Sequence, residues 1–417
     1  MNASACRSAV IGCLLLIPMM IMGAEDAAAR GAGIVAGEGR LHPSLDLELA
    51  YDTNPGYFPN NSSNKTGDML LRIRPGITIL YPSDIFSVDV TGMVGYDWYF
   101  GIINKDTRKL SSIVASGDLK FGFNPKGQVS FFLEDTLSRS GDPQYTSLTG
   151  KFNRTDNEVK AHLQIKPGGQ ALTFDLAYGF FLDYFDIYRE YSSYAHRIYF
   201  SAKWKFLPKT ALIVDADADL RRYLDVYPDG TRNIDINGIR ATVGLQGQIT
   251  SKIGLMVKVG YGDTLLVKPA TYTGSDFRSV VGQAEIEFRS GTTFLQGGYL
   301  RNFQPVMFFA YFGQDRFYVN FIQQIAGKFS IKANVGFDLL NYGTDIRQTP
   351  GSRRWDNALA GNLIVDYNIL DWLNVGLRYD FQALFSKYKQ PISETLPLPA
   401  GVDYNKHVIS LFVVLDY

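Results

Sequence analysis

The chain has very little cysteine and histidine. Its two cysteines, Cys6 and Cys13, lie within the first thirty residues, and its four histidines are far apart in the sequence. Residues 31–417 therefore cannot form disulfides or Cys-ligated metal sites, and the histidines lack the spacing of a metal or catalytic motif. We expect no cofactor, no metal and no enzymatic activity.

An excess of one charge and long apolar runs are also lacking. The sequence has 41 Lys and Arg against 41 Asp and Glu, which gives no reason to expect nucleic acid as a partner. Beyond residue 30, no stretch approaches the roughly 20 apolar residues that a membrane-spanning helix needs. The sequence is instead rich in aromatic residues and glycine, with 28 Phe, 25 Tyr and 40 Gly. Aromatic residues favour strands, and glycine suits tight turns and close strand packing.

The first thirty residues differ from all that follow. Arg7 provides a positive charge, residues 9–23 are apolar, and Ala27 to Ala29 offer a small-residue cleavage site. This pattern predicts a secretory signal peptide over residues 1–29. The glycine-rich stretch after it predicts a flexible periplasmic linker over residues 30–42.

From residue 43 to residue 417, apolar and polar side chains alternate in short segments, which is the period of a β-strand. In LNVGLRYDFQALF, for example, Leu373, Val375 and Leu377 share one face, and Asn374 and Arg378 share the other. We count eighteen such segments, and a miscounted hairpin would make the number sixteen or twenty. The sequence therefore predicts an all-β protein.

The links between these segments alternate in length. Tight links such as YPSD (81–84) and KPGG (166–169) alternate with longer loops such as 53–67 and 138–151. A soluble sandwich has no reason to keep its long loops at one end, whereas a bacterial outer-membrane barrel has short periplasmic turns and long extracellular loops. We therefore predict an antiparallel transmembrane β-barrel of about eighteen strands, with outer-membrane lipid around it and charged residues facing its lumen.

Charged and aromatic residues on the polar faces of the segments are the candidate lining of a solute path. They are Arg72, Arg74, Asp97, Tyr99, Tyr199, Asp215, Asp217, Asp219, Arg221, Glu285, Glu287, Arg316, Tyr318, Arg378 and Asp380. Acids and bases are balanced on the predicted inward face, so no strong ion selectivity is expected. Such a lining suits a polar, weakly charged solute such as a sugar chain. The alternative interpretation is that the charges pair along the wall and hydrate the lumen.

One predicted loop, QPVMFFAYFG (304–313), is unusually apolar. It is a candidate constriction or oligomer contact. The plainer alternative is a strand that continues above the membrane.

The stretch LDLELAYDTNPGYF (45–58) resembles the first strand of a group of bacterial outer-membrane proteins described as β-barrel porins. Tyr51-Asp52-Thr53-Asn54 stands at the position of their tyrosine-aspartate-x-asparagine signature. The resemblance covers the first strand only. It implies the outer-membrane conduit of a polysaccharide (exopolysaccharide or capsule) export system, with a secreted polysaccharide as cargo and a periplasmic polysaccharide export protein as partner. The alternatives are a general diffusion porin for small solutes and a non-conducting barrel that anchors an envelope machine.

The sequence ends HVISLFVVLDY (407–417), an alternating segment that we expect to close against the first strand. Barrels of this general kind end on an aromatic residue that the barrel-assembly machinery recognises. Tyr417 is accordingly a candidate assembly signal.

Overall fold

The computed structural model describes residues 31–143, 151–168, 171–227, 230, 232–268, 274–306, 309–343, 354–388 and 402–417. The predicted signal peptide and parts of several loops lie outside these residues. No helix in this part of the chain is long and apolar enough to cross a membrane.

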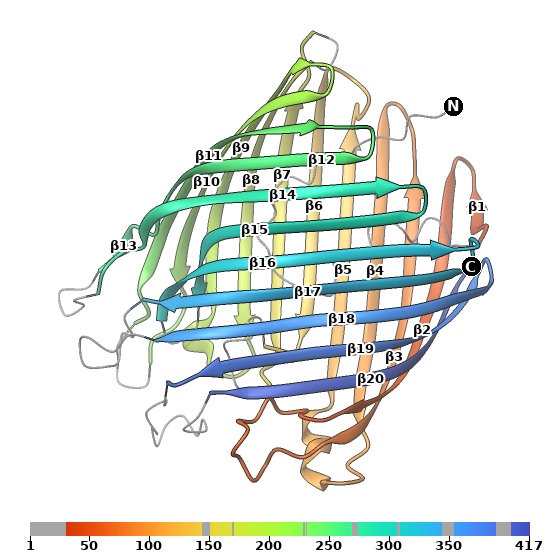
Figure 1. Cartoon of the computed structure of the whole chain (residues 1–417), viewed down its shortest axis with the longest axis vertical. Helices are drawn as coiled ribbons and strands as arrows, with labels where there is room; N and C mark the ends of the chain where they lie inside the picture. Colours follow the sequence, from red (N-terminus) through yellow and green to blue (C-terminus); the bar gives the residue numbers. More distant parts are fainter. Residues whose placement is uncertain are drawn as a thin grey trace.

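Eighteen antiparallel strands form a closed ring, and two short strands are attached to it (Figure 1). The strands are β1 (Ile34–Ala36), β2 (Gly39–Asp52), β3 (Asp68–Tyr81), β4 (Phe86–Tyr99), β5 (Ser112–Phe123), β6 (Val129–Ser140), β7 (Arg154–Ile165), β8 (Leu172–Phe185), β9 (Ser193–Leu207), β10 (Thr210–Tyr223), β11 (Asp235–Gln248), β12 (Ile253–Asp263), β13 (Leu266–Val267), β14 (Arg278–Ser290), β15 (Thr293–Val306), β16 (Phe309–Ile325), β17 (Phe329–Tyr342), β18 (Trp355–Leu370), β19 (Leu373–Ser386) and β20 (Tyr404–Asp416). Each ring strand pairs with the next one in the sequence. The short strands β1 and β13 pair only with β2 and β11, respectively.

The ring closes between its last and first strands. β20 pairs with β2 from Ser44 opposite Asp416 to Asp52 opposite Val408. A closed ring leaves no free sheet edge, so the backbone amides of every ring strand find partners without water, as a bilayer requires. The predicted antiparallel barrel is confirmed.

The two ends of the ring carry different connections. Short links such as 291–292 lie at the end that also holds β1 and the C-terminus, on the right of Figure 1. Longer connections lie at the opposite end, and two of them contain the short helices η2 (Lys105–Leu110) and η3 (Arg189–Tyr191). By the rule for outer-membrane barrels, the short links face the periplasm and the long ones face the exterior.

Two predicted segments take a different form in the structure. Where a flexible linker was predicted, β1 turns back onto β2 through Gly37, whose φ of 64° suits a residue without a side chain. In the apolar segment 304–313, β15 continues to Val306 and β16 begins opposite it at Phe309. The segment is a continued strand, as the plainer alternative had it. Three of its residues, Val306, Phe309 and Phe312, also belong to the apolar cluster described below.

The two faces of the ring differ sharply in chemistry. Outward side chains are mostly aliphatic and exposed, such as Ile73 (40%), Val257 (44%) and Leu377 (57%). Trp98 lies near the end of β4 that leads into a long connection, and Trp204 lies near the end of β9 that leads into a short link, so the two lie toward opposite ends of the barrel, as expected for the two interfaces of a membrane. An apolar exterior around a closed antiparallel ring is the architecture of a bacterial outer-membrane protein, and this chain is a multi-pass β-barrel of that membrane.

Candidate functional site: the lumen

The register of the strands decides which residues face the lumen. Successive side chains of a strand alternate between the two faces, and paired residues on neighbouring strands share a face. Arg72 is paired with both Glu48 and Asp97, and following the pairings around the ring puts every predicted lumen-lining residue on that same inward face. Their part in solute passage stays a prediction.

One group of charges joins the first strands to the last. Glu48, whose side chain is fully buried, lies 2.7 Å from Arg72 and 3.3 Å from Arg378. Asp97 lies 3.2 Å from Arg74 and 3.7 Å from Arg72. These ion pairs link β2, β3, β4 and β19, and Asp380 lies two residues beyond Arg378 on β19. The group therefore connects strands on both sides of the β2–β20 pairing, where the ring closes.

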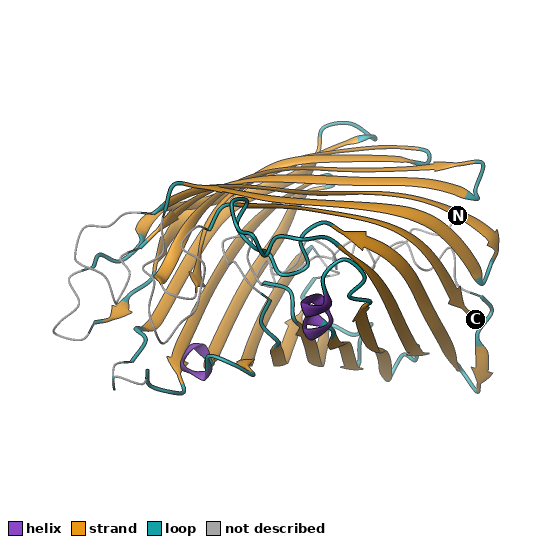
Figure 2. Cartoon of the chain, turned by 90° about the horizontal axis from the view of Figure 1, so that it is seen from below, coloured by secondary structure: helices purple, strands orange, loops and turns teal. Residues whose placement is uncertain are grey.

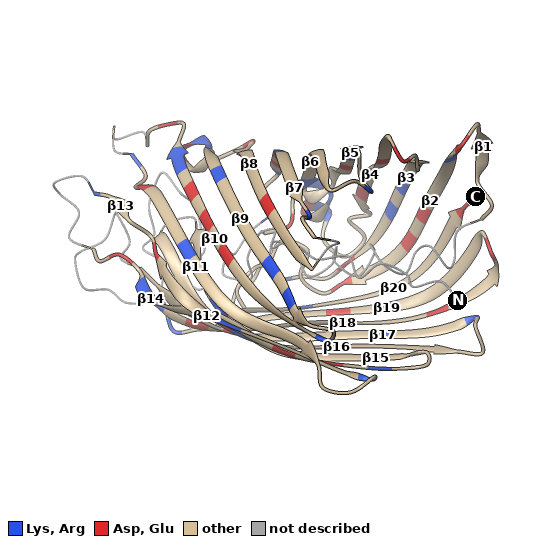
Figure 3. Cartoon of the chain, turned by 90° about the horizontal axis from the view of Figure 1, so that it is seen from above, with Lys and Arg blue, Asp and Glu red and all other residues tan. Residues whose placement is uncertain are grey.

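A second group lines β7 to β11, where basic and acidic residues alternate along the wall (Figure 3). Arg197 lies 3.0 Å from Glu158 and 2.9 Å from Asp219. The hydroxyl of Tyr199 donates to Glu158 at 2.9 Å, and Arg221 lies 3.6 Å from Asp219. Each guanidinium thus has an acidic neighbour, and the wall presents paired rather than isolated charges.

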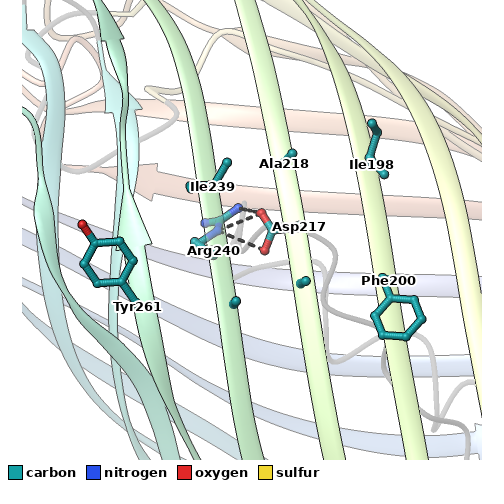
Figure 4. Close-up of a pocket in the computed structure, with 9 residues that line it drawn as sticks. Ile198, Phe200, Asp217, Ala218, Ile239, Arg240 and Tyr261 are labelled. Atoms are coloured by element: carbon teal, nitrogen blue, oxygen red, sulfur yellow. Dashed lines mark hydrogen bonds and ion pairs between the residues drawn. The ribbon is translucent and has the colours of Figure 1, made fainter.

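The same pattern continues on β10 to β12. Lys258 lies 3.2 Å from Asp215, and Arg240 lies 2.7 Å from Asp217. Figure 4 shows the Asp217–Arg240 pair bridging β10 and β11. On the outward side of this wall, a hollow of about 350 Å³ is lined mainly by the apolar side chains of Ile198, Phe200, Ala216, Ala218, Ile239, Ala241 and Tyr261. The wall is thus ionic on the water side and apolar on the lipid side.

The wall from β14 to β18 is richer in amides. The Tyr318 hydroxyl donates to Glu285 at 2.6 Å, and Arg316 lies 3.7 Å from Asp338. Glu287 pairs with Arg289 on the same strand. Asn320 donates to Gln296 at 2.7 Å, and Asn334 donates to Asn362 at 2.6 Å. These neutral donors and acceptors can exchange hydrogen bonds with water or with a polar solute.

Apolar side chains fill part of the lumen at the long-loop end. We call this group the mouth cluster; its members are Tyr57, Val306, Phe309, Phe312, Leu340, Tyr342, Ala358, Leu384, Val402 and Tyr404. All but Tyr57 and Val402 belong to ring strands. Tyr57 comes from the loop 53–67, is only 3% exposed, and stacks edge-on against Tyr404 with ring centroids 5.5 Å apart. This loop therefore folds into the mouth of the barrel, and Figure 2 shows loops within the outline of the strands.

The Tyr51-Asp52-Thr53-Asn54 signature anchors this loop. The Asp52 carboxylate accepts hydrogen bonds from the backbone amide of Asn54 (2.9 Å) and the hydroxyl of Tyr99 (3.0 Å). The Asn54 side chain donates to the carbonyls of Phe58 (2.8 Å) and Asn405 (3.2 Å) and accepts from the Phe58 amide (2.8 Å). Asp52 and Asn54 are both fully buried. The signature thus ties the loop to itself and to β20.

A second connection, between β6 and β7, also reaches inward at its described ends. Lys151 lies over the ring of Tyr99 at 4.9 Å. The Asp142 side chain is exposed to solvent, but the surrounding barrel wall partly desolvates it. This desolvation raises the pKa of Asp142, but the charges of Lys151, Lys406 and Arg72 outweigh it and lower the pKa to about 2. Asp142 is therefore a charged group on the path through the barrel.

Sequence reasoning missed the residues that narrow the mouth. Tyr57, Asp142 and Lys151 lie in loops, where period-2 alternation says nothing, and Lys406 lies at the start of the last strand. The signature at Asp52 and Asn54 was a usable signal, because two short polar residues at a strand end often bond the backbone that follows. Among the described residues, no group of three or more His, Cys, Asp or Glu converges as a metal site would require.

Tyr417, the candidate assembly signal, lies just beyond β20. Its backbone amide donates to the Pro43 carbonyl at 3.1 Å, and its carbonyl lies 3.1 Å from Nδ1 of His42. Its side chain is 54% exposed. Its role in assembly stays a prediction.

Comparison with known proteins supports the fold. No family profile matches the sequence, and no curated protein matches it significantly. Among solved structures, OccAB3 of Acinetobacter baumannii has a TM-score of 0.50 at 9% identity, covering 92% of this chain and 100% of that one. The outer-membrane protein OpdK of Pseudomonas aeruginosa has a TM-score of 0.47 at 11% identity, with coverages of 90% and 99%. OpdK has also been solved with vanillate, with the same TM-score, identity and coverages.

These structural neighbours are outer-membrane porins of the Occ and Opd type. None of the comparisons links the chain to exopolysaccharide export, which the resemblance of the first strand implied. At 9% to 11% identity the likeness concerns the fold, and the chain is accordingly an eighteen-stranded outer-membrane barrel of the porin type of architecture.

Proposed function

We propose that this protein is a passive channel for small polar solutes, which was the first alternative to polysaccharide export. The observation that carries the proposal is the position of Tyr57. Its loop folds into the mouth of the barrel, where the Tyr57 ring is 3% exposed beside Tyr404 and other members of the mouth cluster. A ring of eighteen strands is wide enough for an aqueous channel, and an inward loop reduces that width.

The chemistry of the lumen supports a small, weakly charged solute. Most inward charges are paired, as with Arg197 between Glu158 and Asp219, so the wall offers little net field to select one ion sign. Amides such as Asn320 and Asn334, and hydroxyls such as Tyr318, can replace part of a solute's hydration shell. A solute can therefore pass without binding tightly.

Export of a polymer fits these observations less well. A polysaccharide chain would have to pass the mouth while Tyr57 and Asp142 occupy part of it, so the loops that carry them would have to move. The polysaccharide-export hypothesis is based on the resemblance of the first-strand signature. Asp52 and Asn54 of that signature already have a structural role, because they fix the loop. A periplasmic export protein and a secreted polymer remain expectations of the resemblance alone.

The test uses the purified full-length protein without any partner. In planar bilayers we expect a steady conductance, because a ring of eighteen strands is wide enough for an aqueous channel. In liposomes we expect swelling rates that fall with solute size, fast for monosaccharides and negligible for long oligosaccharides. Tyr57→Ala, which removes the ring from the mouth, should raise the conductance.

Two outcomes would overturn the proposal. One is the absence of conductance from folded protein in the bilayer, which would favour the structural anchor. The other is polymer trapped in the periplasm of a deletion strain, together with normal uptake of small solutes, which would favour export.

A further inference from the structure

One acidic side chain faces lipid without a cation beside it. Asp135 lies at the middle of β6, and its pairing with Leu119 and Val159 puts it on the outward face. Other outward charges are matched: Arg139 pairs with Asp186, Arg222 with Asp235, Arg278 with Asp263 and Arg301 with Asp315. Within the described ranges of the chain, Asp135 has no ion pair.

The surroundings of Asp135 are those of the hydrocarbon-facing wall. Leu133 and Leu137, its outward neighbours on β6, are 39% and 38% exposed. Leu119 on β5 and Val159 on β7, directly opposite it, are 39% and 38% exposed. All four face the same side as the carboxylate, so Asp135 lies within the apolar band rather than at its border.

A polar neighbour on the next strand accompanies the carboxylate. The Asn157 side chain, also outward, donates to Oδ1 of Asp135 at 2.6 Å and to the carbonyl of Thr136 at 3.3 Å. A carboxylate in lipid needs more than one donor, because no water is present to satisfy its other lone pairs. The side chain of Asp135 is too short to reach the lipid headgroups, unlike that of Lys or Arg. This pair is therefore poorly suited to contact with lipid.

The wall beside the pair is unusually flat. Gly92 on β4 and Gly117 on β5 lie directly opposite each other on the outward face. A Cβ at Gly92 would meet no atom within 4 Å, and one at Gly117 would meet only atoms at 3.9 Å. Ala115 is the next outward residue on β5. Small residues of this kind let a second protein surface approach closely in a membrane.

We propose that this face of β4 to β7 is the contact surface for a second copy of the same chain, related by a twofold axis close to Asp135 and Asn157. The pair places an acceptor and a donor side by side, which makes it complementary to itself under a twofold rotation. In the dimer, the Asn157 amide of each copy keeps its bond to its own Asp135 and turns its second N–H from the Thr136 carbonyl, 3.3 Å away, to the Asp135 carboxylate of the other copy. Leu137 and Val159 pack around this polar centre and shield it from lipid.

The first test is cross-linking in outer membranes. The only cysteines of the sequence are Cys6 and Cys13, in the predicted signal peptide, so one introduced cysteine reports on one position. Leu137→Cys and Val159→Cys flank the polar pair, and on oxidation at least one should form a dimer joined by a disulfide. Val335→Cys, on the outward face of β17 and 51% exposed, is the matched control and should stay monomeric. Failure of both flanking cysteines to cross-link would overturn the proposal.

The second test removes the polar pair. Asp135→Leu combined with Asn157→Leu keeps the face apolar, so the barrel should still fold. In mild detergent, native mass spectrometry should show a dimer for the unaltered protein and at least a tenfold weaker dimer for this variant. Arg301→Leu with Asp315→Leu, which removes a matched outward pair elsewhere, should leave the dimer intact. A monomer or a three-copy assembly of the unaltered protein would contradict the twofold contact, as would an unchanged dimer of the leucine variant.

Discussion

Lys406 is a buried cation at the mouth of the barrel. Its ammonium lies 2.8 Å from the fully buried Asp52 and 3.9 Å from the ring centroid of Tyr57. Its own side chain is 7% exposed. An ion buried in this way is stable only while its counter-charge is present, because neither partner can regain its hydration. Lys406 therefore interacts with both Asp52 of the signature and the inward ring of Tyr57.

The first prediction concerns this pair. Lys406→Met should lower the free energy of unfolding by about 3 kcal/mol, because it leaves the carboxylate of Asp52 buried without a cation. Asp52→Asn combined with Lys406→Met should recover a large part of that loss. Urea unfolding in lipid vesicles, followed by tryptophan fluorescence, measures both. If the two single losses simply add in the double variant, the pair is not coupled.

The second prediction concerns Asn54. Asn54→Ala leaves the carbonyls of Phe58 and Asn405 without their side-chain donor, at a cost of about 1–3 kcal/mol for each group that stays buried. The loop 53–67 should then detach from β20, and trypsin should cleave after Lys65 in the folded barrel. Asn61→Ala, at an exposed position of the same loop, is the control and should leave the loop protected. Equal resistance of both variants would show that the signature does not hold the loop.

At the scale of elements, the strands form the wall and the long connections set its bore. The loop 53–67 contributes Tyr57, and the connection between β6 and β7 contributes Asp142 and Lys151. These are charged or aromatic side chains on backbone that is not part of the ladder, so substitutions there alter the path without disturbing strand pairing. The two connections can therefore be tested for permeation separately from folding.

The third prediction uses two residues of one connection. Asp142→Asn removes a negative charge from the path and should shift the reversal potential in a KCl gradient toward anion selectivity. Lys151→Met removes a positive charge and should shift it toward cation selectivity. The two substitutions serve as controls for each other, because they are alike in size of change and differ in sign. Shifts of the same sign, or no shift in either, would place the solute path elsewhere.

At the scale of the whole molecule, the barrel is a protein with its polar side inward. Val257, in the middle of β12, faces lipid and is 44% exposed. Met256, the residue before it, faces the lumen opposite Glu285. Two adjacent positions therefore face different environments, lipid at Val257 and the lumen at Met256. The same substitution at both positions should have different effects on stability.

The fourth prediction makes that comparison. Val257→Lys should destabilise the barrel by roughly 2–4 kcal/mol, the cost of a lysine facing the middle of the bilayer. Met256→Lys should be nearly neutral, since its ammonium enters the wet lumen near the Glu285 carboxylate. Unfolding in vesicles gives both free energies. Equal losses at the two positions would contradict the assignment of inside and outside.

The sequence was sufficient for the ring but not for its interior. Alternation in segments such as 371–387 and the alternating link lengths predicted the strands and their number. The two faces of each strand followed as well, so Arg72 and Asp217 were expected in the lumen. The pairing of Arg72 with Glu48 and of Asp217 with Arg240 was not predictable, because it depends on the register between strands, which a single-strand pattern does not contain.

What the sequence by itself determined was the architecture. Period-2 alternation without a spanning helix leaves a closed ring as the way to satisfy the backbone in lipid. Only the tertiary structure decided the shape of the lumen, since Asn54 and Tyr57 meet Asn405 and Tyr404 from the far end of the chain. Likewise, only the closed ring showed that Asp135 faces lipid and has Asn157 as its partner. The alternation within one strand separates two faces, but it does not show which residues of the neighbouring strands lie beside an acid. Contacts between residues distant in sequence depend on ring closure and register, and these are properties of the folded chain.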